Sequence, residues 1–370
     1  MRVARARFKS GTEVAEPAKL FGRDATLRSL SAALRAGTHT EVVAERKFGK
    51  SSLLRCAAAL FKDDEKFLAV YVSVNYLTCS AWPDFYAWLA AYTLAAAAKR
   101  APLAQLCAAT KFGSKCLGTC SSNPDPYEIF ARLQQNSQKM VSAFQFPFTF
   151  LAAAGISTIL LLDEISSALR YFDGDAEQFR YLRQMAMEQG ASGCQILTVC
   201  TADRTEWQDI ISKAESSPGL NFISNHVRLG PIPEDDVRLL LQTHAAECDP
   251  PFDMPPDISG AILNLAQAYP YYLKVAAEKA YQQAVSSGPH DSALLRENTY
   301  ASVRGHLLRY IGTCNASEKK ALHAVLSSPV SLQQKSIPRD RLFRRGLLRI
   351  DDGLFKPFNP LFRMACEEVL

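Results

Sequence analysis

Apolar residues follow two different periods along the first 230 positions of the chain. Helical spacing appears over residues 24–36, which open with an aspartate able to cap the first turn, and again over 51–61. Four apolar runs are too short for a typical helix and therefore predict buried strands. They lie at 40–45, 67–74, 158–164 and 195–202. Because such strands alternate with helices, the pattern predicts an α/β fold with a parallel sheet and helices on both faces.

The segments between these strands add three predicted helices and one loop. The helices are expected over 82–99, 127–143 and 175–189. Residues 113–126 are rich in Gly, Ser and Pro and are expected to form a loop between helices.

After about residue 230 the strand pattern gives way to helices. Residues 231–248 begin with Pro and acidic residues that favour a helix start, and further helices are predicted near 257–267 and 270–286. Residues 286–292 (SSGPHDS) have the composition of a linker. The remaining sequence predicts helices at SEKKALHAVL and DRLFRRGLL, a hairpin around Asp-Asp-Gly in RIDDGLFKPFN, and a terminal helix.

Length and charge exclude few classes of function. The chain has 370 residues, room for two or three domains, and its net charge of +5 permits an acidic partner without requiring one. The basic start is not followed by an apolar core, and the runs around 86–98 and 144–162 are interrupted before spanning length. We therefore expect no signal peptide, no membrane contact, and a cytoplasmic location, or a nuclear one in a eukaryote.

The ten cysteines are scattered, several of them inside apolar periodic segments, which favours reduced core thiols. Cys107, Cys116 and Cys120 form the one local cluster, for which zinc is the alternative. The cluster lacks a fourth ligand and a paired C-x-x-C spacing, so free thiols are the favoured interpretation.

The stretch VVAERKFGKSSLL, residues 42–54, places a glycine-bearing loop between a predicted strand and a predicted helix. Backbone N–H groups and a helix N-terminus in this context surround phosphate oxygens, a lysine adds charge, and a serine ligates magnesium. Alanine stands at the first glycine position, which is acceptable where φ is negative. A chance Gly-Lys-Ser is the alternative. The predicted nucleotide contacts are Ala44, Glu45, Arg46, Lys47, Phe48, Gly49, Lys50, Ser51 and Ser52.

Two carboxylates end a buried strand about 110 residues later. Asp163 is predicted to hold Mg²⁺ together with Ser51, and Glu164 to orient or deprotonate the attacking water. Thr201 closes the next predicted strand, where it either senses the γ-phosphate or is a plain strand-end residue. Together with Lys50, these residues are the predicted catalytic set of a site for ATP and Mg²⁺.

The chain resembles the archaeal-type P-loop ATPases of the AAA+/STAND group, and more distantly the origin-recognition and loader ATPases. The resemblance covers about residues 19–370 and is carried by LFGRDATLRSL, AERKFGKSSLL, ILLLDE, VRLGPIPEDDVRLLL and AYPYYLKVAAEKA. It implies that Phe21, Gly22 and Arg23 lie near the adenine and that Pro270 of a lid approaches the nucleotide.

Three departures from the family pattern bear on hydrolysis more than on nucleotide binding. Ala44 and Ala268 each stand where the family usually carries glycine, and no sensor-two arginine is evident beside Pro270. An arginine finger is a candidate role for Arg180, Arg183 or Arg204, with a solvated helix arginine as the favoured alternative for each.

Six basic residues lie between positions 335 and 349, against one acid, Asp340: Lys335, Arg339, Arg341, Arg344, Arg345 and Arg349. In a winged helix such a cluster meets phosphates and the major groove, so the five arginines are candidate contacts to double-stranded DNA. The alternative is that the domain packs against the nucleotide domain or binds other proteins.

These patterns predict a P-loop nucleotide-binding domain at 1–230, a helical lid at 231–290 and a winged helix at 291–370. The predicted function is an ATP-hydrolysing switch or assembly ATPase that acts on DNA or on a signalling or defence partner, with protein partners or self-assembly. The alternative is a nucleotide-binding structural subunit of a larger complex with little or no hydrolysis.

Overall fold

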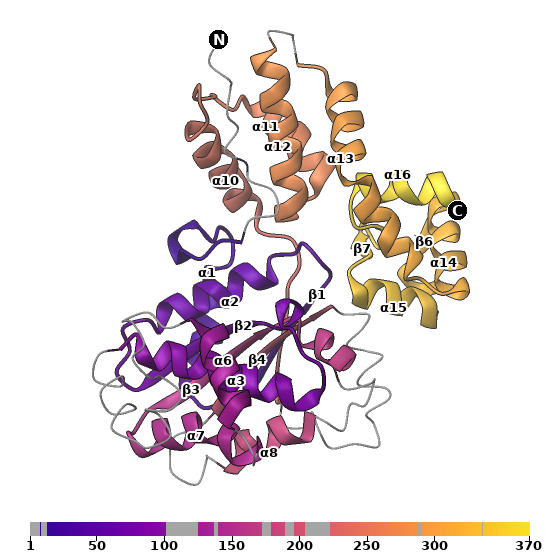
Figure 1. Ribbon diagram of the computed structural model, residues 1–370. Coiled ribbons are helices and arrows are strands. Elements are labelled where there is room, and N and C mark those ends of the chain that lie inside the picture. The colour runs from indigo at the N-terminus through magenta and orange to yellow at the C-terminus, as the bar shows by residue number, and fades with distance from the viewer. Residues whose placement is uncertain are drawn as a thin grey trace.

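A computed structural model describes residue 8 and residues 13–100, 125–136, 140–171, 179–188, 196–203, 223–286, 290–334 and 336–370. Three segments follow one another along the chain: a sheet segment with its helices, a helical segment, and a small C-terminal segment with a second sheet (Figure 1).

The sheet segment is built on five parallel strands in the order β2-β3-β4-β1-β5. Their bounds are β1 Thr40–Ala44, β2 Phe67–Ser73, β3 Ser157–Asp163, β4 Ile196–Asp203 and β5 Asn225–Arg228. The four predicted strands and the parallel sheet are confirmed. Strand β5 was not predicted, because its four residues, NHVR, contain three polar side chains and form no apolar run.

Helices cover both faces of this sheet, and β3 shows it directly. Ile159 and Leu161 belong to a cluster that contains α1 (Asp24–Arg35) and α2 (Lys50–Leu60). Leu160 and Leu162 belong to a second cluster, which contains α3 (Trp82–Ala98). Since successive side chains of a strand point to opposite faces, both faces are buried, which explains the unbroken apolar run of β3.

The remaining helices of this segment differ in detail from the prediction. One helix was expected over 127–143, whereas the structure has α6 (Pro126–Asn136) and α7 (Met140–Ala153), and α7 continues through Pro147. Helix α8 (Arg180–Glu188) falls within the helix predicted over 175–189, of which residues 175–178 and 189 lie outside the described residues. Short 3₁₀ helices η1 (Pro17–Lys19), η2 (Val74–Tyr76) and η3 (Ile165–Tyr171) complete the connections.

The helical segment contains α10 (Glu234–Ala246), α11 (Pro256–Ala266), α12 (Pro270–Val285) and the long helix α13 (Ser292–Gly312). Helix α13 packs along α12 and ends beside the C-terminal segment (Figure 1). Asp291 caps it, since its side chain accepts hydrogen bonds from the backbone N–H groups of Ala293 and Leu294.

The C-terminal segment combines α14 (Ala316–Ser327), α15 (Ile337–Arg345) and α16 (Pro360–Val369) with an antiparallel sheet. That sheet has the order β6-β8-β7 and is formed by β6 (Val330–Ser331), β7 (Leu348–Asp351) and β8 (Leu354–Pro357). The predicted hairpin is present: Asp352 and Gly353 join β7 to β8 with φ angles of 52° and 73°, as a tight hairpin turn requires.

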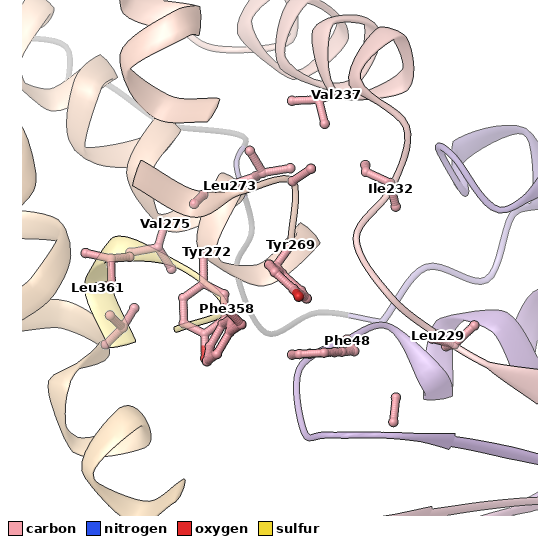
Figure 2. Packing of buried hydrophobic residues seen from close by; sticks show 14 of the residues in the cluster. Phe48, Leu229, Ile232, Val237, Tyr269, Tyr272, Leu273, Val275, Phe358 and Leu361 are labelled. Atoms are coloured by element: carbon pink, nitrogen blue, oxygen red, sulfur yellow. The ribbon is translucent and has the colours of Figure 1, made fainter. Parts of the chain in front are cut away.

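One hydrophobic cluster runs through all three segments. Figure 2 shows Phe48 from the β1–α2 loop beside Tyr269 and Tyr272 of the helical segment and Phe358 of the C-terminal segment. All four side chains are at most 5% exposed. The loop after β1 is thus part of the core that joins the segments.

No helix within the described ranges is long and apolar enough to cross a membrane.

Candidate functional site

A cavity of about 380 Å³ lies at the carboxyl end of β1, between the sheet segment and the helical segment. Its walls come from the chain before α1, the β1–α2 loop with the start of α2, and helices α10, α12 and α13. The lining residues are Glu13, Val14, Lys19, Leu20, Phe21, Arg23, Arg46, Lys47, Phe48, Gly49, Lys50, Ser51, Ser52, Tyr76, Glu164, Leu240, Pro270, Tyr271, Lys274, His306 and Arg309.

The β1–α2 loop (residues 45–49) turns the chain from strand to helix. Gly49 is the N-cap of α2 with φ 91°, and Lys47 also has a positive φ, 67°. Glycine is favoured at position 49, because side chains rarely adopt that conformation. Ala44 is the last residue of β1 and has no positive φ, so alanine at this position is free of backbone strain.

Lys50 points back over this loop. Its Nζ donates to the backbone oxygens of Ala44, at 2.8 Å, and Glu45, at 3.0 Å. The side chain is buried, so the ammonium charge is held at the N-terminus of α2, which itself carries partial positive charge. An anion that enters the cavity here meets both charges.

The two carboxylates occupy different environments. Asp163 is buried at the end of β3 and accepts a hydrogen bond of 2.8 Å from the Tyr71 hydroxyl. Burial and the adjacent Asp163 raise the pKa of Tyr71, so the phenol keeps the proton that it donates. Glu164 follows with φ 55° and lines the cavity.

The structure describes the backbone of Thr201 and not its side chain, so its position is known from the strand register. Leu162 of β3 pairs with Cys200 of β4, so Asp163 and Thr201 stand at the same level on neighbouring strands. Strand β4 continues past the predicted end at residue 202 and finishes at Asp203, which pairs with Ala44. Because β4 lies between β1 and β3, Thr201 stands between the loop and the acids.

The segment before α1 forms one wall. Gly22 has φ 69°, and a Cβ there would lie 2.6 Å from the Ile232 Cβ, so only glycine lets the chain pass. The Arg23 guanidinium is buried and donates to the backbone oxygen of Gly230, and burial lowers its pKa to about 10. Arg23 thereby ties this wall to the entrance of the helical segment.

The opposite wall is formed by helices α12 and α13. Pro270, which was predicted, begins α12. The candidates that were not predicted are Tyr271 and Lys274 of α12 and His306 and Arg309 of α13. Lys47 lies 5.1 Å from the centre of the Tyr271 ring, a cation–π contact between loop and wall. A spacing of three residues, from Tyr271 to Lys274 on α12 and from His306 to Arg309 on α13, is the local signal for these positions.

The cavity carries a large excess of positive charge. Seven basic side chains line it (Lys19, Arg23, Arg46, Lys47, Lys50, Lys274 and Arg309), against two acids, Glu13 and Glu164. Lys274 is partly buried, which lowers the pKa of its ammonium group. Such a charge balance in a concave site suits a polyanionic ligand.

Glu45 and Arg345 form a buried ion pair, which corrects the sequence interpretation of Arg345. Arg345 of α15 was a predicted DNA contact, but its side chain is 3% exposed and its Nε lies 3.5 Å from Oε1 of Glu45. Its Nη1 lies 3.3 Å from Oε2 of Glu318, and its Nη2 donates to the Thr313 hydroxyl at 2.7 Å. Burial by itself lowers the pKa of Arg345, but Glu45, Cys314 and Glu318 raise it, so the guanidinium stays charged. It is inaccessible to a DNA backbone.

Two further contacts cover the loop from the same side. The Tyr310 hydroxyl of α13 donates to the backbone oxygen of Arg46 at 2.6 Å. The Phe48 ring lies 4.6 Å from that of Tyr269 and 6.0 Å from that of Phe358, centre to centre (Figure 2). Three successive parts of the loop therefore touch the helical or the C-terminal segment.

The cavity brings together most of the residues that were predicted from sequence. Those lining it are Phe21, Arg23, Arg46, Lys47, Phe48, Gly49, Lys50, Ser51, Ser52, Glu164 and Pro270. Gly22, Ala44, Glu45 and Asp163 do not line it. Arg180 and Arg183 are on α8 and do not line it, and Arg204 lies outside the described residues.

The remaining candidates lie elsewhere. Arg341 and Arg344 are exposed on α15, and Arg344 pairs with Asp340 at 2.7 Å. Arg339 donates to the backbone oxygen of Gln334, and Arg349 pairs with Asp351 at 3.0 Å. Lys335 and the cysteines 107, 116 and 120 are outside the described residues, within which no group of three or more His, Cys, Asp or Glu suits a metal ion.

No protein-family model matches the chain, and no curated protein is similar to it in sequence. The structure is similar to that of a Walker-type ATPase of Pyrococcus abyssi, with a TM-score of 0.61, 15% identity, and 98% of this chain and 99% of that chain covered. It is also similar to the ORC2 protein of Aeropyrum pernix in its ADPNP and ADP complexes, with a TM-score of 0.56, 13% identity, and coverage of 99% and 98%. The chain therefore shares the overall fold of these two proteins.

Proposed function

We propose that the protein is an ATP-binding and ATP-hydrolysing switch whose nucleotide occupies the cavity between the sheet and helical segments. One observation carries the proposal: seven basic side chains converge with the N-terminus of α2 on one cavity at the carboxyl end of β1. A triphosphate supplies the negative charge that this arrangement lacks. The proposed domains are 1–230, 231–290 and 291–370. The last, a winged helix, includes α13, which is described above with the helical segment because it packs along α12.

The residues present fit a magnesium ion. Asp163 offers a carboxylate oriented by Tyr71, and Ser51 offers a hydroxyl in the first turn of α2, both hard oxygen ligands. Bound there, the ion would neutralise charge on the phosphates. Asp163 is suited to this role because it is buried at the end of β3 and its carboxylate is held by the Tyr71 hydroxyl.

Glu164 is the proposed base of hydrolysis. It lines the cavity next to the magnesium carboxylate, where it can accept a proton from a water molecule. The water oxygen attacks the γ-phosphorus as the bond to the β,γ-bridging oxygen breaks, which gives ADP and inorganic phosphate. Lys50 stabilises the charge on the phosphate oxygens, which replace the backbone oxygens of Ala44 and Glu45 as its hydrogen-bond acceptors.

The contacts of the β1–α2 loop explain how nucleotide binding in the cavity can affect the C-terminal segment. Bound phosphates would draw Lys50 away from the backbone oxygens of this loop. The same loop contacts Arg345 through Glu45 and Tyr310 through Arg46. Nucleotide state thus biases how the C-terminal segment sits on the sheet segment. The exposed arginines 341 and 344, with Arg339, are the proposed contacts to double-stranded DNA.

A structural subunit with little hydrolysis is the second candidate. It is favoured by the buried Glu45–Arg345 pair, which restrains the loop that has to adjust during turnover. The two candidates differ in turnover and not in nucleotide binding.

Substitution of Lys50 and Glu164 tests both candidates. Lys50→Ala is expected to abolish ATP binding in calorimetry, whereas Lys62→Ala, an exposed lysine just beyond the same helix, is expected to bind normally. Glu164→Gln is expected to keep ATP and stop phosphate release. Unchanged affinity in Lys50→Ala would overturn the site. A wild-type protein that binds ATP without turnover would favour the structural subunit.

A further inference from the structure

Glu13 and Val14 form an N-terminal strap that is fastened to helix α2 by three contacts. The Val14 N–H donates to Oγ of Ser52 at 3.0 Å, and the Cys56 thiol donates to the Val14 backbone oxygen at 3.5 Å. Arg55 Nε donates to Oε2 of Glu13. Arg55 and Cys56 follow Ser52 by three and four residues, so the strap lies along one face of α2.

Arg55 also connects the strap to the carboxylate that is proposed to hold magnesium. Its guanidinium carbon lies 4.3 Å from the centre of the Tyr71 ring, a cation–π contact. Tyr71 in turn donates to the buried Asp163 at 2.8 Å. Glu13 lines the nucleotide cavity, whereas Arg55, Tyr71 and Asp163 do not. The four side chains thus form a continuous series of contacts from the cavity wall to the carboxylate.

The charges along this series act on the Tyr71 phenol. Burial and then the charge of Asp163 raise the pKa of Tyr71, Glu13 raises it further, and Arg55 lowers it. A cation over the ring therefore makes the phenol a stronger hydrogen-bond donor to the carboxylate. The same contact limits how the ring can turn, and the ion pair with Glu13 limits how Arg55 can move.

We propose that Arg55 is a positioning residue for magnesium, which is anchored by Glu13 of the N-terminal strap and acts through the Tyr71 phenol on the Asp163 carboxylate. The inference rests on the proposed function, because it concerns the metal of that site. It gives the strap a part in magnesium binding, in addition to its place in the cavity wall.

Arg35 of α1 offers a matched control, since an arginine over an aromatic ring can also be purely structural. Its guanidinium carbon lies 4.8 Å from the centre of the Phe61 ring, and its Nη1 lies 2.7 Å from Oδ2 of Asp64. Phe61 has no hydroxyl that could orient a carboxylate, and none of these three residues lines the cavity.

The test is the Mg²⁺ concentration that gives half of the maximal strengthening of ATP affinity, which calorimetry measures independently of turnover. Arg55→Met is expected to raise that concentration about threefold, the effect of a partly exposed cation–π contact, and to leave the affinity for ATP without Mg²⁺ unchanged. The side chains of Arg55 and Glu13 are 40% and 36% exposed, so this variant leaves no buried charge unpaired. Arg35→Met is expected to show the magnesium dependence of the wild type.

Double variants show whether the residues act in series. Tyr71→Phe already lacks the hydroxyl, so Arg55→Met in that background is expected to change the Mg²⁺ concentration by less than about 1.5-fold. Glu13→Ala is expected to raise it about twofold in the wild type and not in Arg55→Met.

Three results would overturn the inference while ATP binding is intact. They are wild-type magnesium dependence in Arg55→Met, an undiminished effect of Arg55→Met in the Tyr71→Phe background, and ATP binding by the wild type that does not depend on Mg²⁺. A wild type that binds no ATP would overturn the proposed function, and this inference with it.

Discussion

Arg345 is buried against Glu45, a residue 300 positions earlier in the chain, with 3.5 Å between Nε and Oε1. The pair joins helix α15 of the C-terminal segment to the loop that follows β1. Glu318, which forms a capping box with Asn315 at the start of α14, accepts a hydrogen bond from the same guanidinium. The Arg345 side chain thus connects an acid of the β1–α2 loop with an acid at the start of α14.

Loss of this arginine is expected to be costly. Arg345→Met leaves Glu45 and Glu318 buried without their cation, which typically destabilises a protein by about 3–5 kcal/mol. Urea unfolding of this variant is expected to show a much lower midpoint, and Arg344→Met, its exposed neighbour, a change of less than about 0.5 kcal/mol. Equal midpoints for the two variants would show that the buried pair contributes little.

The hydrogen bond from Tyr71 to Asp163 is expected to matter for magnesium use. In Tyr71→Phe the carboxylate loses the donor that orients it, so the Mg²⁺ concentration for half-maximal ATP hydrolysis is expected to rise about tenfold. Tyr300→Phe removes a phenol that also bonds a carboxylate, Glu368, but far from the cavity, and serves as the control. Identical magnesium dependence in Tyr71→Phe and wild type would contradict the role.

Arg309 is expected to contact the nucleotide from α13. Arg309→Ala removes a cation from the cavity wall and is expected to weaken ATP binding about tenfold, with a smaller effect on adenosine, which lacks phosphates. Arg296→Ala, an exposed arginine near the start of the same helix, is the matched control. Calorimetry gives both affinities, and a reduction that is equal for ATP and adenosine would mean that Arg309 does not act on the phosphates.

DNA binding, if carried by α15, is expected to depend on Arg341 and Arg344. Their joint replacement by alanine should weaken binding to all duplex sequences and flatten the dependence on salt by about 0.9 for each phosphate that is no longer neutralised. Arg28→Ala with Arg238→Ala removes two exposed arginines elsewhere and controls for net charge. Fluorescence anisotropy over a range of salt concentrations measures the slope. Salt-independent or undetectable binding by the wild type would assign the segment to protein contacts.

His244 is expected to make stability depend on pH. Burial and then the charge of Lys274 lower its pKa below the usual 6.5, while Glu247 raises it and Lys19 lowers it slightly. The folded state therefore binds fewer protons than the unfolded state, so stability rises with pH and is lost as pH falls through 6.5 towards the folded-state pKa.

The corresponding measurement is the melting temperature at about pH 7.5 and about pH 5.5. His244→Gln is expected to reduce the loss of stability on acidification by about 1–3 °C, and His323→Gln, an exposed histidine, to leave it unchanged. A loss that is the same in wild type and His244→Gln would assign the acid sensitivity to other groups.

The sequence by itself determined the features that depend on neighbouring residues. Gly49 and Lys50 predict where a loop ends and a helix starts. In the structure the loop ends at Gly49 and helix α2 starts at Lys50. The apolar run that ends at Asp163 predicts a strand buried on both faces with carboxylates at its end, which β3 confirms. The same reasoning gave the parallel sheet, the helices after residue 230 and the C-terminal hairpin.

Tertiary structure decided which distant segment covers each of these elements. Arg345 follows the buried Leu342 by three residues, so helical spacing places it towards the core, but no local pattern names Glu45 as its partner. The cavity residues Lys274, His306 and Arg309 likewise depend on how α12 and α13 pack over the β1–α2 loop. Periodicity reports which face of a segment is buried, whereas charge pairs and cavities depend on distances in space between segments hundreds of residues apart.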